Sequence, residues 1–277
     1  MSSSGETRAG VVAVHGGRIR QVARLAGIVG WTAFSFILWG GGTLVLLPAV
    51  EARRRWRLAS FRRWAGGVAH LLGMRRVVEG APPADAPFIL VTNHVSYVDI
   101  ILLASVVPGV FVAKREVRSW PMWGIFAGAM RTIFVDRERR RDALRVSDQI
   151  QEALARGDGV ILFPEGTSTD GRHVRPLKPA LLEVAARHGY PVHHARVSYR
   201  TSSDAPPAHL AVCWWGDMEF GPHFAELCRL PGFQATVTFA ASPIVERDRK
   251  ALAQKLHRAL TQDLVPAVSE ESQWQHA

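Results

Sequence analysis

Hydrophobic and polar positions divide the chain into a charge-free stretch near its start and a long region of short alternating runs. The stretch Leu25–Val50 holds 26 residues without a charge. A helix of that length reaches about 39 Å, which exceeds the roughly 30 Å hydrocarbon core of a bilayer. We therefore expect a helical membrane anchor here. Glycines at 40–42 and Pro48 interrupt the run, which leaves open a bent or re-entrant hairpin instead of a straight span.

The segment that follows the charge-free stretch combines arginines with tryptophans. In Trp56–Arg76 the apolar residues recur at helical spacing beside arginines, a pattern typical of a helix that lies on an anionic membrane interface. Arginines flank the charge-free stretch on both sides and are denser after it, so the positive-inside rule places the rest of the chain in the cytoplasm. We expect a flexible tail over residues 1–17, membrane-anchoring and interfacial helices over 18–78, and one folded domain over 79–277.

Within the folded domain, short β-rich runs alternate with helical segments. This alternation predicts an α/β fold, a mixed β-sheet flanked by helices, with functional residues on the loops that follow the strands. The expected strands are Phe88–Thr92, Val110–Ala113, Thr132–Val135, Val160–Phe163, His193–Val197, Leu210–Trp214 and Ala235–Phe239. The expected helices are Arg140–Ala155, Pro179–His188 and Arg247–Leu264.

Composition and charge narrow the class of partner. Apolar residues make up 48% of the chain, which excludes a disordered protein. The net charge of +10 favours a polyanionic partner such as nucleic acid, an anionic membrane or a phosphorylated substrate. We see no helix-turn-helix, zinc or RNA-stacking motif, so we expect no nucleic-acid partner. Cys213 and Cys228 form no CxxC pair, which favours a reducing compartment.

The first candidate site follows the strand expected at 88–92. Asn93 and His94 come directly after this strand, and Asp99 follows the histidine by five residues. A turn can bring Asp99 back to accept the Nδ1–H of His94, which fixes the tautomer and leaves Nε2 as a general base. A surface histidine beside a helix-capping aspartate has the same spacing, so this motif alone does not decide between them.

The second candidate site is the loop Phe163–Gly171, again directly after an apolar run. Glu165 can orient a polyol or nearby cations, and Gly166 allows a close approach of the backbone. Thr167 and Ser168 offer hydroxyl and N–H donors to an anion. An ordinary polar loop between a strand and a helix remains the alternative.

A third group of candidates consists of cations. The chain has only four lysines, and two of them, Lys114 and Lys178, lie at the end of an expected strand or just after the second loop. With Arg137 and Arg175 they form an expected phosphate-binding set. Each of them taken alone is better explained as a surface charge than as a ligand.

Taken in order, these motifs resemble those of the 1-acylglycerol-3-phosphate acyltransferases, within the glycerolipid acyltransferase group. The resemblance covers roughly residues 88–200. The His-x4-Asp block of the family is matched by His94 and Asp99. Phe163–Thr167 matches its Phe-Pro-Glu-Gly-Thr block, and Tyr190–Val192 resembles its proline-bearing fourth block. The remaining block, Lys-x2-Leu-x6-Gly-x12-Arg, is matched by Lys114, Gly124 and Arg137, with Val117 in the leucine position.

Two departures from the family pattern stand out. Ser168 occupies the position where the family usually has an arginine that is thought to hold the substrate phosphate. That role can pass to Arg137, Arg172, Arg175 or Lys178, or the acceptor can lack a simple phosphate. The fourth block continues with two histidines at 193 and 194, where proline and aliphatic residues are usual. No carboxylate or cysteine lies at a helpful spacing from them, so we expect no metal site.

The resemblance implies the glycerolipid acyltransferase fold and an acyl transfer to the free hydroxyl of 1-acyl-sn-glycerol-3-phosphate, which forms phosphatidate. The co-substrate is a thioester of acyl-carrier protein or coenzyme A, with no bound cofactor. His94 is then the general base, Asp99 stabilises its imidazolium, and Lys114 or nearby N–H groups stabilise the oxyanion. The residues expected to bind substrate are Asn93, Ser96, Lys114, Arg137, Glu165, Gly166, Thr167, Ser168, Arg175 and Lys178.

The expected partners are therefore membrane lipids, a lysophospholipid acceptor and an acyl-thioester donor, with the catalytic domain on the cytoplasmic face of the inner membrane. A second interpretation keeps the dyad but changes the acceptor to another lysolipid such as lyso-ornithine lipid. A third, from another class, is a non-catalytic, basic, membrane-tethered lipid-binding protein. The segment Ala211–Pro243 has no assigned role.

Overall fold

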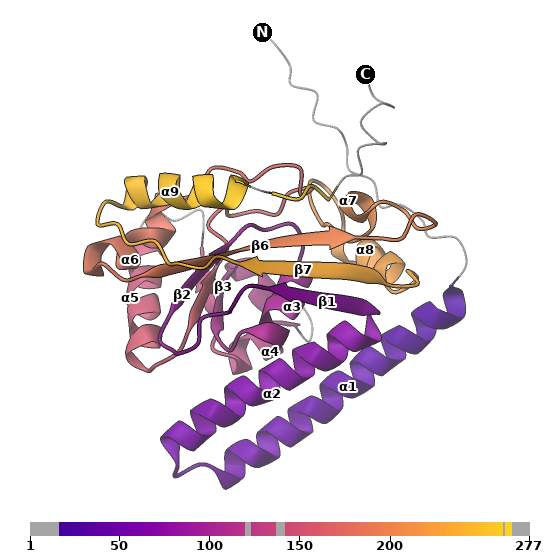
Figure 1. The fold of residues 1–277 in the computed structure, drawn as a ribbon. Helices are drawn as coiled ribbons and strands as arrows, with labels where there is room; N and C mark the ends of the chain where they lie inside the picture. Colours follow the sequence, from indigo (N-terminus) through magenta and orange to yellow (C-terminus); the bar gives the residue numbers. More distant parts are fainter. Residues whose placement is uncertain (1–16, 120–122, 137–141, 263, 268–277) are drawn as a thin grey trace, which may run out of the picture.

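The computed structural model describes residues 17–119, 123–136, 142–262 and 264–267, so all of the expected tail except Gly17 lies outside it. Within these ranges a β-sheet with helices on both faces lies beside an N-terminal pair of long helices (Figure 1). The strands are β1 (Met74–Glu79), β2 (Ile89–Thr92), β3 (Val110–Lys114), β4 (Ile133–Val135), β5 (Val160–Leu162), β6 (Val192–Arg200) and β7 (Phe233–Phe239). The helices are α1 (Arg18–Val45), α2 (Val50–Leu71), α3 (Val98–Val106), α4 (Trp123–Ala129), α5 (Asp142–Ala155), α6 (Glu183–His188), α7 (Ala208–Ala211), α8 (Phe220–Leu227) and α9 (Arg249–Thr261). Two 3-10 helices cover Arg115–Ser119 and Pro179–Leu182.

The sheet is mixed, as the sequence predicts. Its strand order is β1-β7-β6-β2-β5-β3-β4, and each pair of neighbours is parallel except β6 and β7. Strands buried on both faces read as continuous apolar runs, which is why β2 and β5 stood out in the sequence. Because β2, β3 and β5 are parallel neighbours, their carboxyl ends meet at one edge of the sheet, and the candidate motifs follow these ends.

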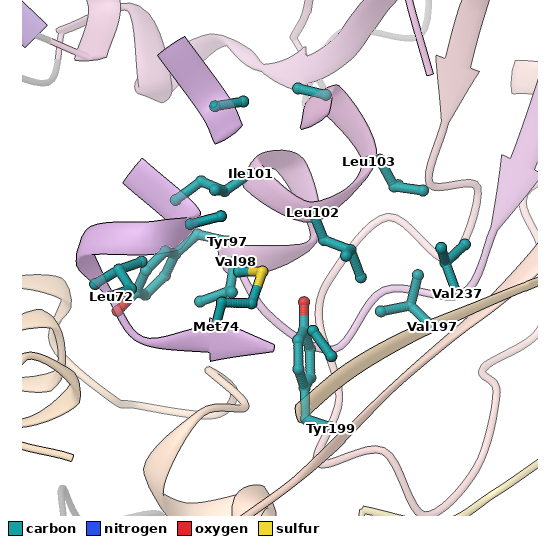
Figure 2. Close-up of a cluster of buried hydrophobic side chains, with 14 of the residues drawn as sticks. Leu72, Met74, Tyr97, Val98, Ile101, Leu102, Leu103, Val197, Tyr199 and Val237 are labelled. Atoms are coloured by element: carbon teal, nitrogen blue, oxygen red, sulfur yellow. The ribbon is translucent and has the colours of Figure 1, made fainter. Parts of the chain in front are cut away.

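Two hydrophobic clusters cover the two faces of the sheet. One cluster includes buried residues of α2, α3 and α8, and the other includes buried residues of α5, α6 and α9. In β2, Leu90 belongs to the first cluster, whereas its neighbours Ile89 and Val91 belong to the second. Figure 2 shows part of the first cluster, where Leu102 and Leu103 of α3 lie close to the sheet. Burial on both sides holds the edge that carries the motifs rigid.

Two segments differ from the expectations. The expected interfacial segment Trp56–Arg76 is helical only to Leu71, and β1 at Met74–Glu79 pairs parallel with β7, so the sheet begins within residues 18–78. The strand expected at Leu210–Trp214 is wrong, because its start lies in helix α7. A short apolar run does not distinguish a strand from a buried segment. β6, which precedes it, already has β2 and β7 on its two edges.

The N-terminal helices α1 and α2 form an antiparallel hairpin (Figure 1). Trp31 of α1 and Trp56 of α2 each donate their indole N–H to a backbone carbonyl of the opposite helix at 3.0 Å. Each ring lies over a glycine of the other helix, Gly67 and Gly42, where an added Cβ would overlap the ring. Glycine at these two positions therefore allows the helices to approach closely.

Helix α1 is attached to the folded domain only in part. Near its start, Arg24 donates to the carbonyl oxygens of Leu230 at 2.6 Å and Pro231 at 3.1 Å. Among the described helices, α1 is the one long and apolar enough to cross a membrane by length and composition, and only 11% of its apolar window is buried. Apolar side chains on the outer side of α1, such as Phe34, Ile37 and Leu44, are therefore exposed, which agrees with the membrane association expected from the sequence.

Candidate active site

The short connection between β2 and α3 brings His94 and Asp99 together. His94 follows the end of β2 at Thr92, and Asp99 lies in the first turn of α3, where the helix dipole favours an anion. The Nδ1 of His94 lies 2.7 Å from Oδ2 of Asp99, and the aspartate is fully buried. When Nδ1–H donates to this carboxylate, Nε2 carries the lone pair that a general base needs. The geometry expected from the spacing is present.

The Asp99 carboxylate is held by further donors. Its Oδ2 also accepts the backbone N–H groups of Val95 at 2.8 Å and Ser96 at 3.1 Å. Its Oδ1 accepts the hydroxyl of Tyr199 on β6 at 2.7 Å. Tyr199 is not among the residues expected at the site, because a tyrosine 100 residues away in a strand pattern carries no local sign that it reaches this loop.

Asn93 and Ser96, which we expected to bind substrate, hold the loop in place through their side chains. The amide of Asn93 donates to the carbonyl of Val197 at 2.9 Å and accepts the N–H of the same residue at 2.8 Å. The hydroxyl of Ser96 donates to the carbonyl of Val212 at 2.7 Å. Both side chains are buried, so their polar atoms replace backbone partners that the loop lacks. Neither lines the cavity described below.

Glu165 has a similar role between the two motif loops. One carboxylate oxygen accepts the backbone N–H of His94, and the other accepts that of Arg175, both at 2.7 Å. The side chain is only 3% exposed. Burial raises the pKa of Glu165 to about 7, although both N–H donors act in the opposite direction. The residue thus positions the backbone of His94, and it does not line the cavity described below.

A cavity of about 260 Å³ opens beside His94. Among the expected substrate residues, Lys114, Thr167 and Ser168 line it together with the histidine. The His94 ring stacks on Phe163, with 4.3 Å between the ring centroids. The rest of the wall is mainly apolar and includes Phe61, Trp64, Phe111, Trp214, Trp215 and Phe220.

The apolar part of this wall comes from segments that the sequence analysis did not connect to the site. Phe61 and Trp64 belong to α2 of the hairpin, and Trp214, Trp215 and Phe220 come from the unassigned segment Ala211–Pro243. Amphipathic helical spacing indicates that α2 buries one face, but it does not show which part of the protein this face packs against. The hairpin that carries the candidate anchor helix therefore also forms part of the site.

The other described cations of the expected set, Arg175 and Lys178, follow the second loop and do not line the cavity. Gly166 has a φ of 78°, and the Lys178 side chain crosses it so closely that a Cβ would lie 2.6 Å from Nζ. The backbone N–H of Lys178 donates to the carbonyl of Pro164 at 2.8 Å, which closes the loop. The side chain of Arg175 is exposed. Arg137 lies outside the described residues.

The two histidines of the fourth block lie on β6, away from the cavity. His193 pairs with Leu90 and His194 with Val91 of β2, and burial lowers the pKa of both. No group of three histidine, cysteine, aspartate or glutamate side chains in the described part of the chain could hold a metal ion.

Comparisons with known proteins agree with this site. The family model described as "Acyltransferase" matches residues 75–198. The lyso-ornithine lipid O-acyltransferase of Brucella abortus is 37% identical over 70% of this chain and 79% of its own length. That of Pseudomonas aeruginosa is 32% identical over 88% of this chain and 93% of its own length. The 1-acyl-sn-glycerol-3-phosphate acyltransferase of Neisseria meningitidis is 32% identical over 49% of this chain and 57% of its own length.

The fold is also shared with a solved structure. The crystal structure of the 1-acyl-sn-glycerophosphate (LPA) acyltransferase PlsC from Thermotoga maritima matches with a TM-score of 0.60 at 23% identity. The match covers 93% of this chain and 99% of that protein. The chain therefore belongs to the acyltransferase family that contains the lyso-ornithine lipid and 1-acyl-sn-glycerol-3-phosphate acyltransferases.

Proposed function

We propose that this protein transfers a fatty acyl group from a thioester to the hydroxyl group of lyso-ornithine lipid. The observation that carries the reaction type is that His94, which is paired with Asp99, lines a cavity whose remaining wall is mostly apolar. The apolar part suits an acyl chain, since burial of each CH₂ contributes about 0.8 kcal/mol. The pair suits a hydroxyl that must lose its proton.

The reaction has two bond changes. The acceptor oxygen attacks the thioester carbonyl and forms the C–O bond, while Nε2 of His94 takes the hydroxyl proton. Asp99 stabilises the resulting imidazolium through Nδ1–H. The C–S bond then breaks, and the imidazolium returns the proton to the leaving thiolate. Lys114, which lines the cavity with His94, supplies positive charge for the transient oxyanion. No acyl-enzyme and no metal take part.

Two observations support the choice of acceptor. The lyso-ornithine lipid O-acyltransferases from Brucella abortus and Pseudomonas aeruginosa match over 79% and 93% of their own lengths. Ser168, whose side chain is neutral, also lines the cavity at the position where the family usually has an arginine. A guanidinium is the preferred partner of a phosphate, so its absence favours a headgroup without one. Lyso-ornithine lipid thus becomes the first candidate acceptor, whereas the sequence-based expectation placed lysophosphatidate first.

Lysophosphatidate is the second candidate, and the loop cations support it. Arg175 and Lys178 are exposed on the connection between β5 and α6, which also carries Ser168. The chain also keeps the motif order of the 1-acylglycerol-3-phosphate acyltransferases. Cations on this connection could bind a phosphate without an arginine at 168.

The test is a competition between the two acceptors. The purified protein in lipid nanodiscs is given an acyl thioester, either of acyl-carrier protein or of coenzyme A, and kcat/KM is measured for each lysolipid. We expect at least a tenfold preference for lyso-ornithine lipid with one of the donors. A preference for lysophosphatidate contradicts the proposed acceptor and keeps the mechanism. Absence of turnover with every pair contradicts the mechanism and favours the lipid-binding interpretation.

A substitution tests the role of position 168 directly. Ser168→Arg restores the guanidinium of the family pattern, so we expect the kcat/KM ratio to shift at least tenfold toward lysophosphatidate. Ser202→Arg, on an exposed loop after β6, adds the same charge away from the cavity and should leave the ratio unchanged. Equal effects of the two variants would mean that only net charge matters.

We further propose that the protein works at the cytoplasmic face of the inner membrane. The hairpin exposes apolar residues of α1, and arginines lie on α2 beside them. A lysolipid acceptor is a bilayer amphiphile, so a cavity with one wall formed by α2 can take it up from the interface.

A further inference from the structure

We propose that Tyr199 is a positioning residue for the acyl transfer, because its hydroxyl holds the Asp99 carboxylate in the orientation that His94 requires. The inference rests on the proposed function of the His94–Asp99 pair. It concerns a residue of β6 outside the four motif blocks, which lies behind the pair and does not line the cavity.

The two oxygens of Asp99 have different surroundings. Oδ2 receives three donors from its own loop, namely His94 Nδ1 and the N–H groups of Val95 and Ser96. Oδ1 receives the hydroxyl of Tyr199 at 2.7 Å. Rotation of the carboxylate would exchange the two oxygens, and the hydroxyl opposes that rotation from the far side. The orientation of His94 thus depends on a bond that leaves the loop.

The surroundings of this bond are apolar. Figure 2 shows Tyr199 with its hydroxyl directed toward α3 and with Leu102, Val197 and Val237 nearby, all of them buried. The ring is fixed edge-on against Phe233, with 6.0 Å between the centroids. An acceptor left unpaired in such a place keeps its full desolvation cost. Loss of the hydroxyl would therefore leave Oδ1 without a compensating donor.

Burial favours the protonated form of Tyr199, which is the form that donates this hydrogen bond. Complete burial raises the pKa of Tyr199 well above its usual value, and the charge of Asp99 adds to this effect. The hydroxyl therefore stays protonated and donates to the carboxylate. A neutral donor of this kind stabilises the anion without introducing a second charge into the core.

The other titratable groups near the pair have separate partners. Glu165 binds two backbone N–H groups, and the hydroxyl of Tyr97 bonds to His223 at 2.9 Å. Burial raises the pKa of the Cys213 thiol well above its usual value, so the thiol stays neutral. In the described part of the structure, Tyr199 is thus the side-chain donor recorded for Oδ1 of Asp99.

The experiment is a double-mutant cycle of Tyr199→Phe and Asp99→Asn. Tyr199→Phe should lower kcat about 10- to 100-fold with both KM values within about twofold, because the substrate contacts are untouched. In the Asp99→Asn background the same change should cost less than about twofold, since residues that act through one another are not additive. Equal losses in the two backgrounds would overturn the proposal.

A pH profile separates positioning from general damage. Without the hydroxyl the ionised carboxylate is less stable, so the His94–Asp99 pair should take up its proton at a higher pH. The acidic limb of kcat/KM should move up by a measurable fraction of a pH unit in Tyr199→Phe. Val237 is a buried neighbour that pairs with Val197 between β7 and β6. The control Val237→Ala should lower the unfolding temperature but leave the acidic limb of kcat/KM in place. An unshifted limb in Tyr199→Phe contradicts the proposal.

A readout without turnover distinguishes this inference from the proposed function. Titration of the His94 imidazole by NMR should show protonation at a higher pH in Tyr199→Phe than in the wild-type protein. A wild-type protein that transfers no acyl group would contradict the proposed function, yet the titration would still decide whether Tyr199 acts on the pair. An unchanged His94 titration would overturn the role of Tyr199 even in an active enzyme.

Discussion

The polar residues around His94 divide into those that hold it and those that face the cavity. Asp99 and Glu165 bond to the ring or the backbone of the histidine from buried positions. Thr167 and Ser168 line the cavity instead. Substitution in the first group should lower kcat by misplacing the imidazole, whereas substitution in the second should mainly change KM for the acceptor.

Replacement of His94 tests the general base. His94→Ala should lower kcat by about 10²- to 10⁴-fold, the usual contribution of a positioned acid–base group. Because the hairpin does not depend on this side chain, flotation with lipid vesicles should be unchanged. Thioester consumption and vesicle binding are measured on the same preparation. Turnover within tenfold of the wild-type rate would remove His94 from the role of base.

The buried Glu165 predicts how stability depends on pH. Its pKa rises from an ordinary 4.5 to about 7 in the folded protein, so between these values the folded state binds more protons than the unfolded state. Stability from this group therefore falls as pH rises through that window, by up to about 3 kcal/mol at ~1.4 kcal/mol per pKa unit. Glu165→Gln, which cannot ionise, lacks this loss.

The measurement is the free energy of unfolding of both proteins between pH 5 and pH 8. As pH rises, the free energy of unfolding of Glu165→Gln should increase relative to that of the wild-type protein. The amide replaces one hydrogen-bond acceptor by a donor, so this variant should also be less active. His223, whose pKa burial lowers to about 4, is present in both proteins and cancels from the difference. Parallel pH curves for the two proteins would contradict the predicted ionisation of Glu165.

At the scale of elements, α2 connects the anchor, the cavity and the sheet. Its Phe61 and Trp64 line the cavity, and its Arg57 bonds to Asp158, just before β5, at 2.9 Å. Arg57 is 6% exposed and Asp158 is fully buried. A buried ion pair adds little net stability, but loss of one partner leaves an uncompensated charge. The pair therefore fixes where α2 lies against the sheet.

We expect Arg57→Met to destabilise the protein by about 3 kcal/mol, the lower end for a broken buried pair. Two further arginines, Arg54 and Arg156, lie 3.7 and 3.8 Å from Asp158 and retain part of the compensation. Arg55→Met on the same helix loses only an exposed pair with Glu51 and should cost at most about 0.5 kcal/mol. Denaturant unfolding compares the two, and equal stabilities would mean that the buried pair does not hold α2.

At the scale of the whole molecule, the hairpin presents an apolar helix and a basic helix side by side. α1 has exposed apolar side chains along its length, whereas α2 carries six arginines. Charged side chains are expensive at the centre of a bilayer. Because the two helices run together over their length (Figure 1), we expect a hairpin that enters one leaflet, with the exposed arginines of α2, namely Arg55, Arg62 and Arg63, at the headgroups.

The exposed apolar face of α1 should carry the membrane binding. Phe34, Ile37 and Leu44 are more than half exposed, and each contributes about 1.5–3 kcal/mol when buried. Replacement of all three by serine should therefore weaken binding to vesicles with anionic lipids by well over tenfold. Leu144→Ser on α5, also exposed, is the matched control and should bind normally. Flotation at equal protein concentration compares them, and normal binding of the triple variant would place the contact elsewhere.

Much of the fold was readable from local pattern. The predicted runs overlap all strands from β2 to β7. β2 and β5 are buried along their whole length, and strands buried on both faces are continuously apolar. β6 and β7 instead alternate buried and half-buried positions, the period-2 pattern of a strand. β1 was missed because it is an edge strand whose exposed Arg75 and Arg76 continue the basic helical pattern of α2. Edge strands expose part of their length, so their hydrophobic signal is weak.

The sequence by itself determined which residues can perform acid–base chemistry and where the loops that carry them begin, since His94 and Asp99 are separated by a single turn and Phe163–Thr167 follows a buried strand. The tertiary structure alone decided which polar groups face the cavity and which hold the loops. Backbone groups are the hydrogen-bond partners of Asn93, Ser96 and Glu165. Distant segments of the chain bring Tyr199, Phe61 and Trp214 to the site. Residue type and spacing specify local geometry, but the partner of a buried polar group is set by packing between segments far apart in the chain.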